Sequence, residues 1–240
     1  MSYLNTKPLI YGFEKGMMAD QVELVTDYPA SIADMLINGE VDISLLPVAV
    51  IPLLKEHYII SDYCIGCEGE VASVCLFSDV PLPEMRSIIL DYQSRTSAEL
   101  LKILLRDHWK INPEIIVGEA GYENKIRGNV AGLVIGDRAF IQAKKSKYSY
   151  DLGTAWLELT GLPFVFAAWV ANKKLPEDFL ENFNKTTREG LQHLKEVINE
   201  NPYAHYDLNK YYSENISFTL TGEKKKALHE YLRKSDFFMC

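Results

Sequence analysis

One turn of the sequence, Asp91-Tyr92-Gln93-Ser94-Arg95-Thr96-Ser97, combines residue types that bind anions. It follows a predicted strand and precedes a predicted helix whose capping box is formed by Thr96 and Glu99. A helix N-terminus offers free amide donors and about half a positive elementary charge. The hydroxyl groups add donors and Arg95 adds a cation, so the pattern suits a carboxylate or a phosphate. Plain capping beside a surface arginine explains the same residues, and the local sequence leaves both interpretations open.

A second turn of this kind, Ile135-Gly136-Asp137, also joins a predicted strand to a helix. Glycine lets the backbone approach a ligand closely at Gly136. The simplest role for Asp137 is to cap the helix, and a catalytic role is the alternative.

Cys64-Ile65-Gly66-Cys67 has the spacing of a metal or redox motif. A structural zinc site needs four nitrogen or sulfur ligands, and no second pair with suitable spacing follows. A redox motif of the thioredoxin type opens a helix, whereas this one precedes a predicted strand. We therefore expect no metal here, and we expect Gly66 and Gly69 to shape a tight loop beside a cleft.

Other catalytic patterns are missing from the sequence. The five histidines are scattered, and none lies in a glycine-rich turn. No G-x-S-x-G, Walker or G-x-G-x-x-G motif occurs, so a hydrolase triad, a nucleotide phosphate loop and a dinucleotide site lack support. Trp156, Trp169 and the phenylalanines that follow Gly161 can stack on a ring-shaped ligand, although core packing is the commoner role. Gly161 is expected to end a helix.

The elements that would position these turns alternate between strand and helix. Helices are predicted around Ile32–Leu36 with Gly39 at the end, around Leu100–Leu105, after Pro176 and from Thr221 to Lys234. The alternation favours an α/β fold with mainly parallel sheet. The predicted strands are Val22–Val25, Val41–Leu46, Tyr58–Asp62, Val71–Phe77, Ser87–Asp91, Glu114–Val117, Ala131–Ile135 and Phe164–Val170.

Charge and chain length indicate two lobes. Residues 1–80 hold 3 basic and 12 acidic residues, whereas residues 81–171 hold 11 and 10. Two apolar strands, Val71–Phe77 and Phe164–Val170, bracket the middle segment and are expected to carry the chain between the lobes. We predict one discontinuous lobe from 1–78 plus 172–240, a second lobe from 79–171, and a ligand in the cleft between them.

Composition excludes several classes of protein. The 240 residues are 48% hydrophobic and 24% charged, which is ordinary for a globular chain. A net charge of −8 argues against a non-specific nucleic-acid partner. The longest apolar run, Leu162–Ala171, is far shorter than the ~20 residues of a membrane helix, so no membrane partner is expected. Four cysteines without an export signal predict a cytoplasmic protein.

Six motifs in a fixed order carry a family resemblance. Together they resemble the chorismate dehydratase family of the futalosine route to menaquinone, over about the first 170 residues. The motifs are Tyr3-Leu4-Asn5-Thr6-Lys7-Pro8-Leu9, Asp42-Ile43-Ser44-Leu45-Leu46-Pro47, Cys67-Glu68-Gly69-Glu70-Val71-Ala72-Ser73-Val74, Ser94-Arg95-Thr96-Ser97, Ile135-Gly136-Asp137, and Trp156 with Thr160-Gly161-Leu162-Pro163-Phe164-Val165-Phe166-Ala167.

The resemblance implies a two-lobed fold of the type II periplasmic-binding-protein kind. It also implies a hydro-lyase that converts chorismate, a dianion, to 3-[(1-carboxyvinyl)oxy]benzoate and water without a metal or an organic cofactor. Asn5 then takes the family's functional position, at the end of a strand that only two residues precede. The implied substrate-binding residues are Ser73, Ser94, Arg95, Thr96, Ser97, Gly136, Asp137, Gly161, Pro163 and Phe164.

No side chain in the matched turns is a convincing general base. Apart from Lys7 and Cys67, these turns contain no histidine, lysine or cysteine, so we expect a carboxylate of the substrate to take the proton. Asn5 would set the geometry, and Lys7 ranks second as the base. The alternatives are a non-catalytic ligand-binding protein of the same fold and the sister 1,4-dihydroxy-6-naphthoate synthase, which requires a reacting histidine. An exported solute receptor is the least favoured, and the oligomeric state stays open.

Overall fold

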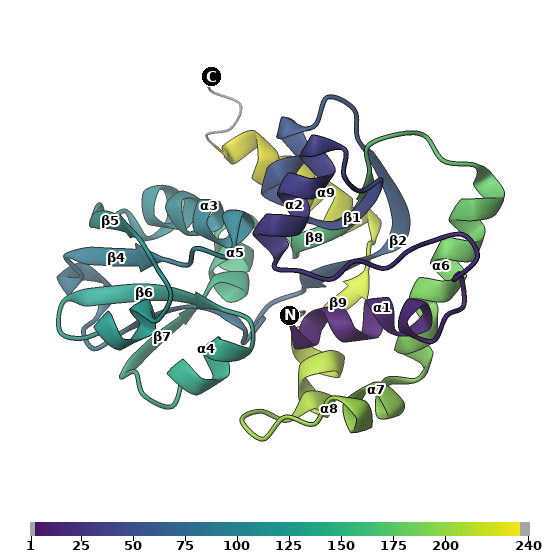
Figure 1. Ribbon diagram of the computed structural model, residues 1–240. Helices are drawn as coiled ribbons and strands as arrows, with labels where there is room; N and C mark the ends of the chain where they lie inside the picture. Colours follow the sequence, from purple (N-terminus) through teal and green to yellow (C-terminus); the bar gives the residue numbers. More distant parts are fainter. Residues whose placement is uncertain (1–2, 236–240) are drawn as a thin grey trace.

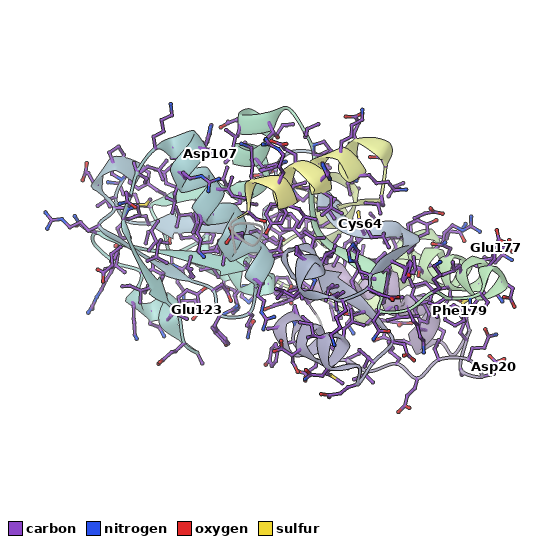
Figure 2. The ribbon with its side chains drawn as sticks, turned by 90° about the horizontal axis from the view of Figure 1, so that it is seen from above. Asp20, Cys64, Asp107, Glu123, Glu177 and Phe179 are labelled. Atoms are coloured by element: carbon purple, nitrogen blue, oxygen red, sulfur yellow. The ribbon has the colours of Figure 1, made fainter. Side chains whose placement is uncertain are left out.

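The computed structural model describes residues 3–235 and shows two α/β lobes side by side, each built on its own sheet (Figure 1). Seen from above, Asp107 and Glu123 lie in one lobe, whereas Asp20 and Glu177 lie at the far end of the other (Figure 2). No helix of the described chain is both long and apolar enough to cross a bilayer.

The first lobe contains a four-stranded sheet in the order β1-β8-β2-β9, and every pairing in it is antiparallel. Helix α2 contacts β1, α6 contacts β2 and α1, and α9 contacts β8. The strands are β1 (Ile43–Pro47), β2 (Tyr58–Cys67), β8 (Phe164–Ala171) and β9 (Ser217–Thr219). The helices are α1 (Lys7–Glu14), α2 (Pro29–Asn38), α6 (Glu177–Gln192), α7 (Leu194–Glu200), α8 (Leu208–Lys210) and α9 (Gly222–Lys234).

The second lobe contains a five-stranded sheet in the order β5-β4-β6-β3-β7. Its strands are β3 (Val74–Ser78), β4 (Ser87–Leu90), β5 (Glu114–Val117), β6 (Val130–Ile135) and β7 (Tyr148–Asp151). Its helices are α3 (Arg95–Ile103), α4 (Asp137–Gln142) and α5 (Leu152–Thr160).

The prediction of mainly parallel sheet is wrong. Only β4 runs parallel to its neighbours, β5 and β6. The other pairings are antiparallel, with β3 in register with β6 at Leu76 and Leu133. The reason lies in the path of the chain. The first and last strands of the second lobe, β3 and β7, run antiparallel to the strands they pair with. Strand–helix alternation in the sequence does not reveal the direction of a strand.

The structure places two strands in lobes other than those predicted. β3, expected in the first lobe, belongs to the five-stranded sheet, and β8, expected in the second, belongs to the four-stranded sheet. The chain therefore crosses between the sheets just before β3 and just before β8. An apolar run shows that a strand is buried but not which sheet buries it.

The strand predicted at Val22–Val25 does not form. Residues 22–28 have no regular secondary structure, and among residues 3–235 no strand pairs with them or with the outer edge of β1. β-Branched residues favour an extended backbone, but a strand needs a neighbour to accept its hydrogen bonds. Two short strands, β7 and β9, were not predicted. Three of the expected helix boundaries are confirmed, at Gly39, Pro176 and Thr221.

Candidate functional site

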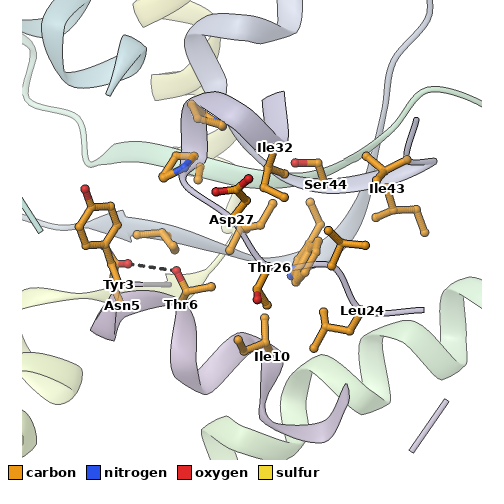
Figure 3. A pocket seen from close by; sticks show the side chains of 18 of the residues that line it. Tyr3, Asn5, Thr6, Ile10, Leu24, Thr26, Asp27, Ile32, Ile43 and Ser44 are labelled. Atoms are coloured by element: carbon orange, nitrogen blue, oxygen red, sulfur yellow. Dashed lines mark hydrogen bonds between the residues drawn. The ribbon is translucent and has the colours of Figure 1, made fainter. Parts of the chain in front are cut away.

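A cavity of about 570 Å³ lies between the lobes and gathers five of the predicted site residues. They are Asn5, Ser73, Ser94, Ser97 and Gly136. Figure 3 shows Asn5 and Thr6 on one side of this cavity, with Leu24, Ile43 and Ser44 on the other. The site is thus assembled from segments that are far apart in the chain.

Asn5 lies in a short 3₁₀ turn, Leu4–Thr6, that leads directly into α1. Its side-chain carbonyl accepts a hydrogen bond from Thr6 Oγ1 at 3.3 Å. The backbone of Leu4 fixes the turn at both polar groups, because its N–H donates to Asp137 Oδ1 at 3.2 Å and its carbonyl accepts from the Tyr212 hydroxyl at 2.8 Å. The predicted strand ending at Asn5 is therefore replaced by a turn that contacts both lobes.

The hydroxyl-rich turn caps α3, but two residues earlier than predicted. Ser94 is the N-cap, and its Oγ accepts from the Ser97 N–H at 3.0 Å and donates to the Ser97 Oγ at 2.8 Å. Thr96, expected to cap the helix, is buried and accepts from the backbone N–H of Ala49 at 3.2 Å. The capping box fails because Ser94 is the residue with extended φ and ψ, which an N-cap requires.

Arg95 does not face the cavity. Its guanidinium donates to Asp34 Oδ1 of α2 at 2.8 Å and so joins the two lobes at the surface. The positive charge expected beside the anion site is therefore directed elsewhere. The donors that remain at the cavity are the hydroxyl of Ser97 and the free amides of the first turn of α3.

The backbone conformation and the close neighbours of position 136 allow only glycine there. Its φ is +63°, and a Cβ there would lie 2.4 Å from Cδ1 of Tyr3, so a side chain would be both strained and blocked. The Gly136 N–H donates to the carbonyl of Ser73 at 2.8 Å. Asp137 begins α4 and does not cap it through its side chain; it accepts from Leu4 instead. Burial raises the pKa of Asp137 above its ordinary value.

The remaining predicted residues lie away from the cavity. Gly161 ends α5, as expected, with φ +71°. The carbonyl of Pro163 accepts from Trp156 Nε1 at 3.0 Å, and the ring of Phe164 packs 5.1 Å from that of Tyr231. None of the three lines the cavity, because Phe164 is buried in the core, Pro163 is half-buried at the end of the loop, and Gly161 is exposed.

The two alternative proton acceptors are also absent from the lining. Lys7 pairs with Glu14 at 3.2 Å. Cys67 is fully buried, and burial raises the pKa of its thiol to about 12. The Cys64–Cys67 segment lies within β2, so the tight loop predicted around Gly66 is wrong. A Cβ at Gly66 would lie 2.5 Å from the carbonyl oxygen of Phe164, which explains the glycine there by sheet packing.

The cavity lining also carries acidic and aromatic side chains. It includes Glu23, Asp27, Glu40 and Asp42, together with the cation of Lys173, which pairs with Asp42 at 2.7 Å. Phenylalanine and tryptophan rings line the same cavity, and the Trp169 indole N–H is buried without a partner in the described chain. Carboxylates repel a dianionic ligand, so the hydroxyl groups of the lining are better suited to bind its carboxylates.

Comparison with known proteins gives the family. A family model described as menaquinone biosynthesis matches residues 1–236. The chain belongs to the menaquinone biosynthesis family. A relative in Thermus thermophilus, named chorismate dehydratase, is 31% identical over an alignment of 191 residues, and the match covers 70% of this chain and 69% of the relative.

Solved structures agree with the fold of this family member. Protein AF1704 from Archaeoglobus fulgidus superposes with a TM-score of 0.77 at 14% identity, covering 97% of this chain and 93% of that one. The alkanesulfonate-binding protein SsuA from Xanthomonas axonopodis pv. citri gives 0.61 at 8% identity, covering 98% and 90%. The two-lobed architecture is thus that of solute-binding proteins, as predicted.

Sequence reasoning missed a buried polar network behind the site of this family member. Arg138 Nη2 donates to Asp91 Oδ2 at 2.6 Å and to Gln93 Oε1 at 3.0 Å, and Arg138 Nη1 donates to Glu123 Oε1 at 2.6 Å. The Tyr3 hydroxyl donates to the same Gln93 oxygen. The available signals were Asp91 at the end of a buried strand and Arg138 beside a matched motif.

Proposed function

We propose that this chain is a chorismate dehydratase, a hydro-lyase that converts chorismate to 3-[(1-carboxyvinyl)oxy]benzoate and water. The observation that supports this most is the single cavity that gathers Asn5, Ser73, Ser94, Ser97 and Gly136, residues that the family motifs select. The family match supports the pathway, and the name of the Thermus relative supports the substrate.

The reaction removes the ring hydroxyl and the hydrogen on the neighbouring ring carbon. The ring then becomes aromatic, which supplies much of the driving force, so no strong nucleophile is required. The protein has to hold two carboxylates, keep the scissile C–O and C–H bonds in position, and stabilise the departing hydroxide. Positioning and fixed hydrogen-bond donors supply effects of this kind.

The start of α3 is the proposed carboxylate site. Ser94 and Ser97 line the cavity there, and Ser97 is almost fully buried. The nine residues of α3 direct their free N-terminal amides and the positive end of the helix dipole to the same place.

Asn5 is the proposed catalytic residue. With its carbonyl oxygen engaged by Thr6, its amide nitrogen is free to donate to the ring hydroxyl or to the enolpyruvyl carboxylate. The lining of the described chain holds no histidine or cysteine, and its one lysine is paired with Asp42. We therefore propose that the enolpyruvyl carboxylate accepts the ring proton, and that the proton then leaves with the hydroxide as water.

We also propose that the protein is cytoplasmic. Its partner is a small-molecule substrate, not a nucleic acid or a membrane. Support comes from Cys64, Cys67 and Cys75, which are free thiols, as expected in a reducing compartment.

Incubating the purified protein with chorismate and following the loss of diene absorbance tests the activity. We expect absorbance to fall while 3-[(1-carboxyvinyl)oxy]benzoate appears in equal amount by liquid chromatography. Chorismate binding by calorimetry without turnover would favour the non-catalytic binding protein. If the protein neither binds chorismate nor turns it over, the proposed function is overturned.

A further inference from the structure

The hydroxyl of Tyr3 joins the turn that holds Asn5 to the hydroxyl-rich turn at the start of α3. Tyr3 lines the cavity and stands two residues before Asn5. Its hydroxyl donates a hydrogen bond to Oε1 of Gln93, which is buried and directly precedes Ser94. One side-chain contact therefore links the turn of the proposed catalytic residue to the proposed carboxylate site.

The direction of this bond follows from the donors and acceptors around Gln93. An arginine can only donate, and Arg138 Nη2 lies 3.0 Å from the same side-chain atom of Gln93, so that atom is the amide oxygen. An amide oxygen only accepts, and the Tyr3 hydroxyl must therefore donate to it. The amide nitrogen of Gln93 donates to the Tyr92 hydroxyl at 3.0 Å, so both ends of the amide have partners.

Gln93 is itself held by a buried carboxylate. The side chain of Asp91 is fully buried and accepts from Arg138 Nη2 at 2.6 Å and from the backbone N–H of Gln93 at 2.9 Å. It also accepts from the backbone N–H of Ile135, the last residue of β6, at 3.2 Å. Because linked hydrogen bonds reinforce one another, the ends of β4 and β6 form a fixed frame. Tyr3 attaches the N-terminal turn to this frame.

Two further contacts keep Tyr3 in this place without its hydroxyl. Its ring covers Gly136, where a Cβ would lie 2.4 Å from Cδ1 of Tyr3. The N–H of the next residue, Leu4, donates to Asp137 Oδ1 at 3.2 Å. Removal of the hydroxyl should therefore loosen the turn without unfolding it, and the loss falls on the spacing between Asn5 and the start of α3.

We infer that Tyr3 is a positioning residue that, through Gln93, sets the distance between the Asn5 side chain and the carboxylate site at the start of α3. The inference rests on the proposed dehydratase function, because a substrate that meets both groups at once requires them at a fixed separation. Misplacement of a reacting group by about 1 Å can lower a rate by about 100-fold.

Tyr3→Phe tests the inference, with Tyr150→Phe as the matched control. Both tyrosines are half-buried, but the Tyr150 hydroxyl accepts from the backbone N–H of Leu82 at 3.2 Å and lies outside the cavity lining. We expect Tyr3→Phe to lower kcat for chorismate by about 5- to 30-fold with KM changed less than about threefold, because the carboxylate site itself stays intact. Tyr150→Phe should keep kcat within about twofold of the wild type, and circular dichroism should show both variants folded.

A double-mutant cycle shows whether Tyr3 acts through Gln93. Gln93→Met keeps the length of the side chain and removes the amide oxygen, so it should lower kcat at least as much as Tyr3→Phe does. In the Gln93→Met background the Tyr3 hydroxyl has lost its acceptor, and Tyr3→Phe should then change kcat by less than about twofold. Losses that multiply in the double variant would overturn the route through Gln93.

The outcomes separate this inference from the proposed function. An active wild type with Tyr3→Phe equal to Tyr150→Phe overturns the positioning role alone, and so does a raised KM with an unchanged kcat. An inactive wild type overturns the proposed function and this inference with it. If Gln93→Met does not fold, a crystal structure of the wild type with 3-[(1-carboxyvinyl)oxy]benzoate decides. Product held between Asn5 and Ser97 with Tyr3 bonded to Gln93 supports the inference, and Tyr3 turned away from Gln93 overturns it.

Discussion

The residue before Asn5, Leu4, is fixed at both of its backbone polar groups, so the Asn5 side chain is the part of this turn that can respond to a ligand. The turn around it is held by Asp137 and Tyr212 through the backbone of Leu4. The Asn5 side chain contributes little to that anchoring. Its removal should therefore affect chemistry far more than folding.

Asn5→Ala is expected to lower kcat/KM for chorismate by about 10²- to 10³-fold, which is typical for loss of a fixed donor to a developing charge. Thermal unfolding followed by circular dichroism should change little. Asn124→Ala, at an exposed position in the second lobe, is the matched control and should keep the wild-type rate. A rate for Asn5→Ala within about threefold of the wild type would remove Asn5 from the mechanism.

Asp137 gives a prediction about pH. Burial raises its pKa in the folded state above the value of 3.8 expected when unfolded, so between these two values the folded state binds more protons. The contribution of Asp137 to the free energy of unfolding must then fall as pH rises through that window.

Asp137→Asn removes this titration while its side-chain oxygen can still accept from Leu4. The stability of the variant relative to the wild type should therefore increase as pH rises from about 3.5 toward neutrality, and should level off above the folded-state pKa. Urea unfolding at a series of pH values measures the difference. A difference that is constant or falls with pH would contradict the burial effect.

At the scale of elements, the start of α3 has two roles. Ser94 caps the helix through the Ser97 N–H and also lines the cavity. Thr221 caps α9 in the same way, by accepting from the Lys224 N–H at 3.3 Å, but it does not line the cavity. A comparison of variants at the two caps therefore separates the effect on helix stability from the effect on ligand binding.

Ser94→Ala and Thr221→Ala should each lower the free energy of unfolding by about 1 kcal/mol, the usual loss for an N-cap. Only Ser94→Ala should also raise KM for chorismate, since it removes a hydroxyl group that lines the proposed carboxylate site and orients the Ser97 hydroxyl there. Urea unfolding and steady-state kinetics on both variants provide the comparison. An equal KM in the two variants would place the substrate carboxylate elsewhere.

At the scale of the whole molecule, side chains join the lobes across the surface as well as inside the cleft. Arg95 pairs with Asp34 at 2.8 Å, and Lys234 of α9 pairs with Asp107 at 3.1 Å. Asp107 lies in the second lobe (Figure 2). Two ion pairs therefore help to hold the lobes in this arrangement, although exposed pairs contribute modestly and are screened by salt.

The double variant Asp34→Asn with Lys234→Gln should shift the protein toward a more open arrangement. We expect a larger radius of gyration by small-angle X-ray scattering and a KM for chorismate raised about two- to fivefold at low salt, with the difference from wild type shrinking in 0.5 M salt. Glu223→Gln, which breaks an exposed pair within α9, is the control. An unchanged radius and KM would show that these pairs do not govern closure.

Much of the local structure could be predicted because it depends on neighbouring residues. Gly39 and Gly161 end helices, Thr221 begins one, and β5 covers the predicted residues. Steric limits and local hydrogen bonds set these features, and both are visible in a few consecutive residues. The family motifs likewise selected most of the polar residues that line the cavity.

Only the tertiary structure decided which strands share a sheet, where Arg95 points and what holds Asn5. The Tyr212 hydroxyl and the Leu4 carbonyl are separated by 208 positions in the chain, and the Tyr211 and Ser73 side chains by 138. A short sequence pattern cannot show such contacts, because they form only when two lobes and a C-terminal segment pack together. The types of the reacting groups were thus readable in the sequence, but their orientation depends on long-range packing.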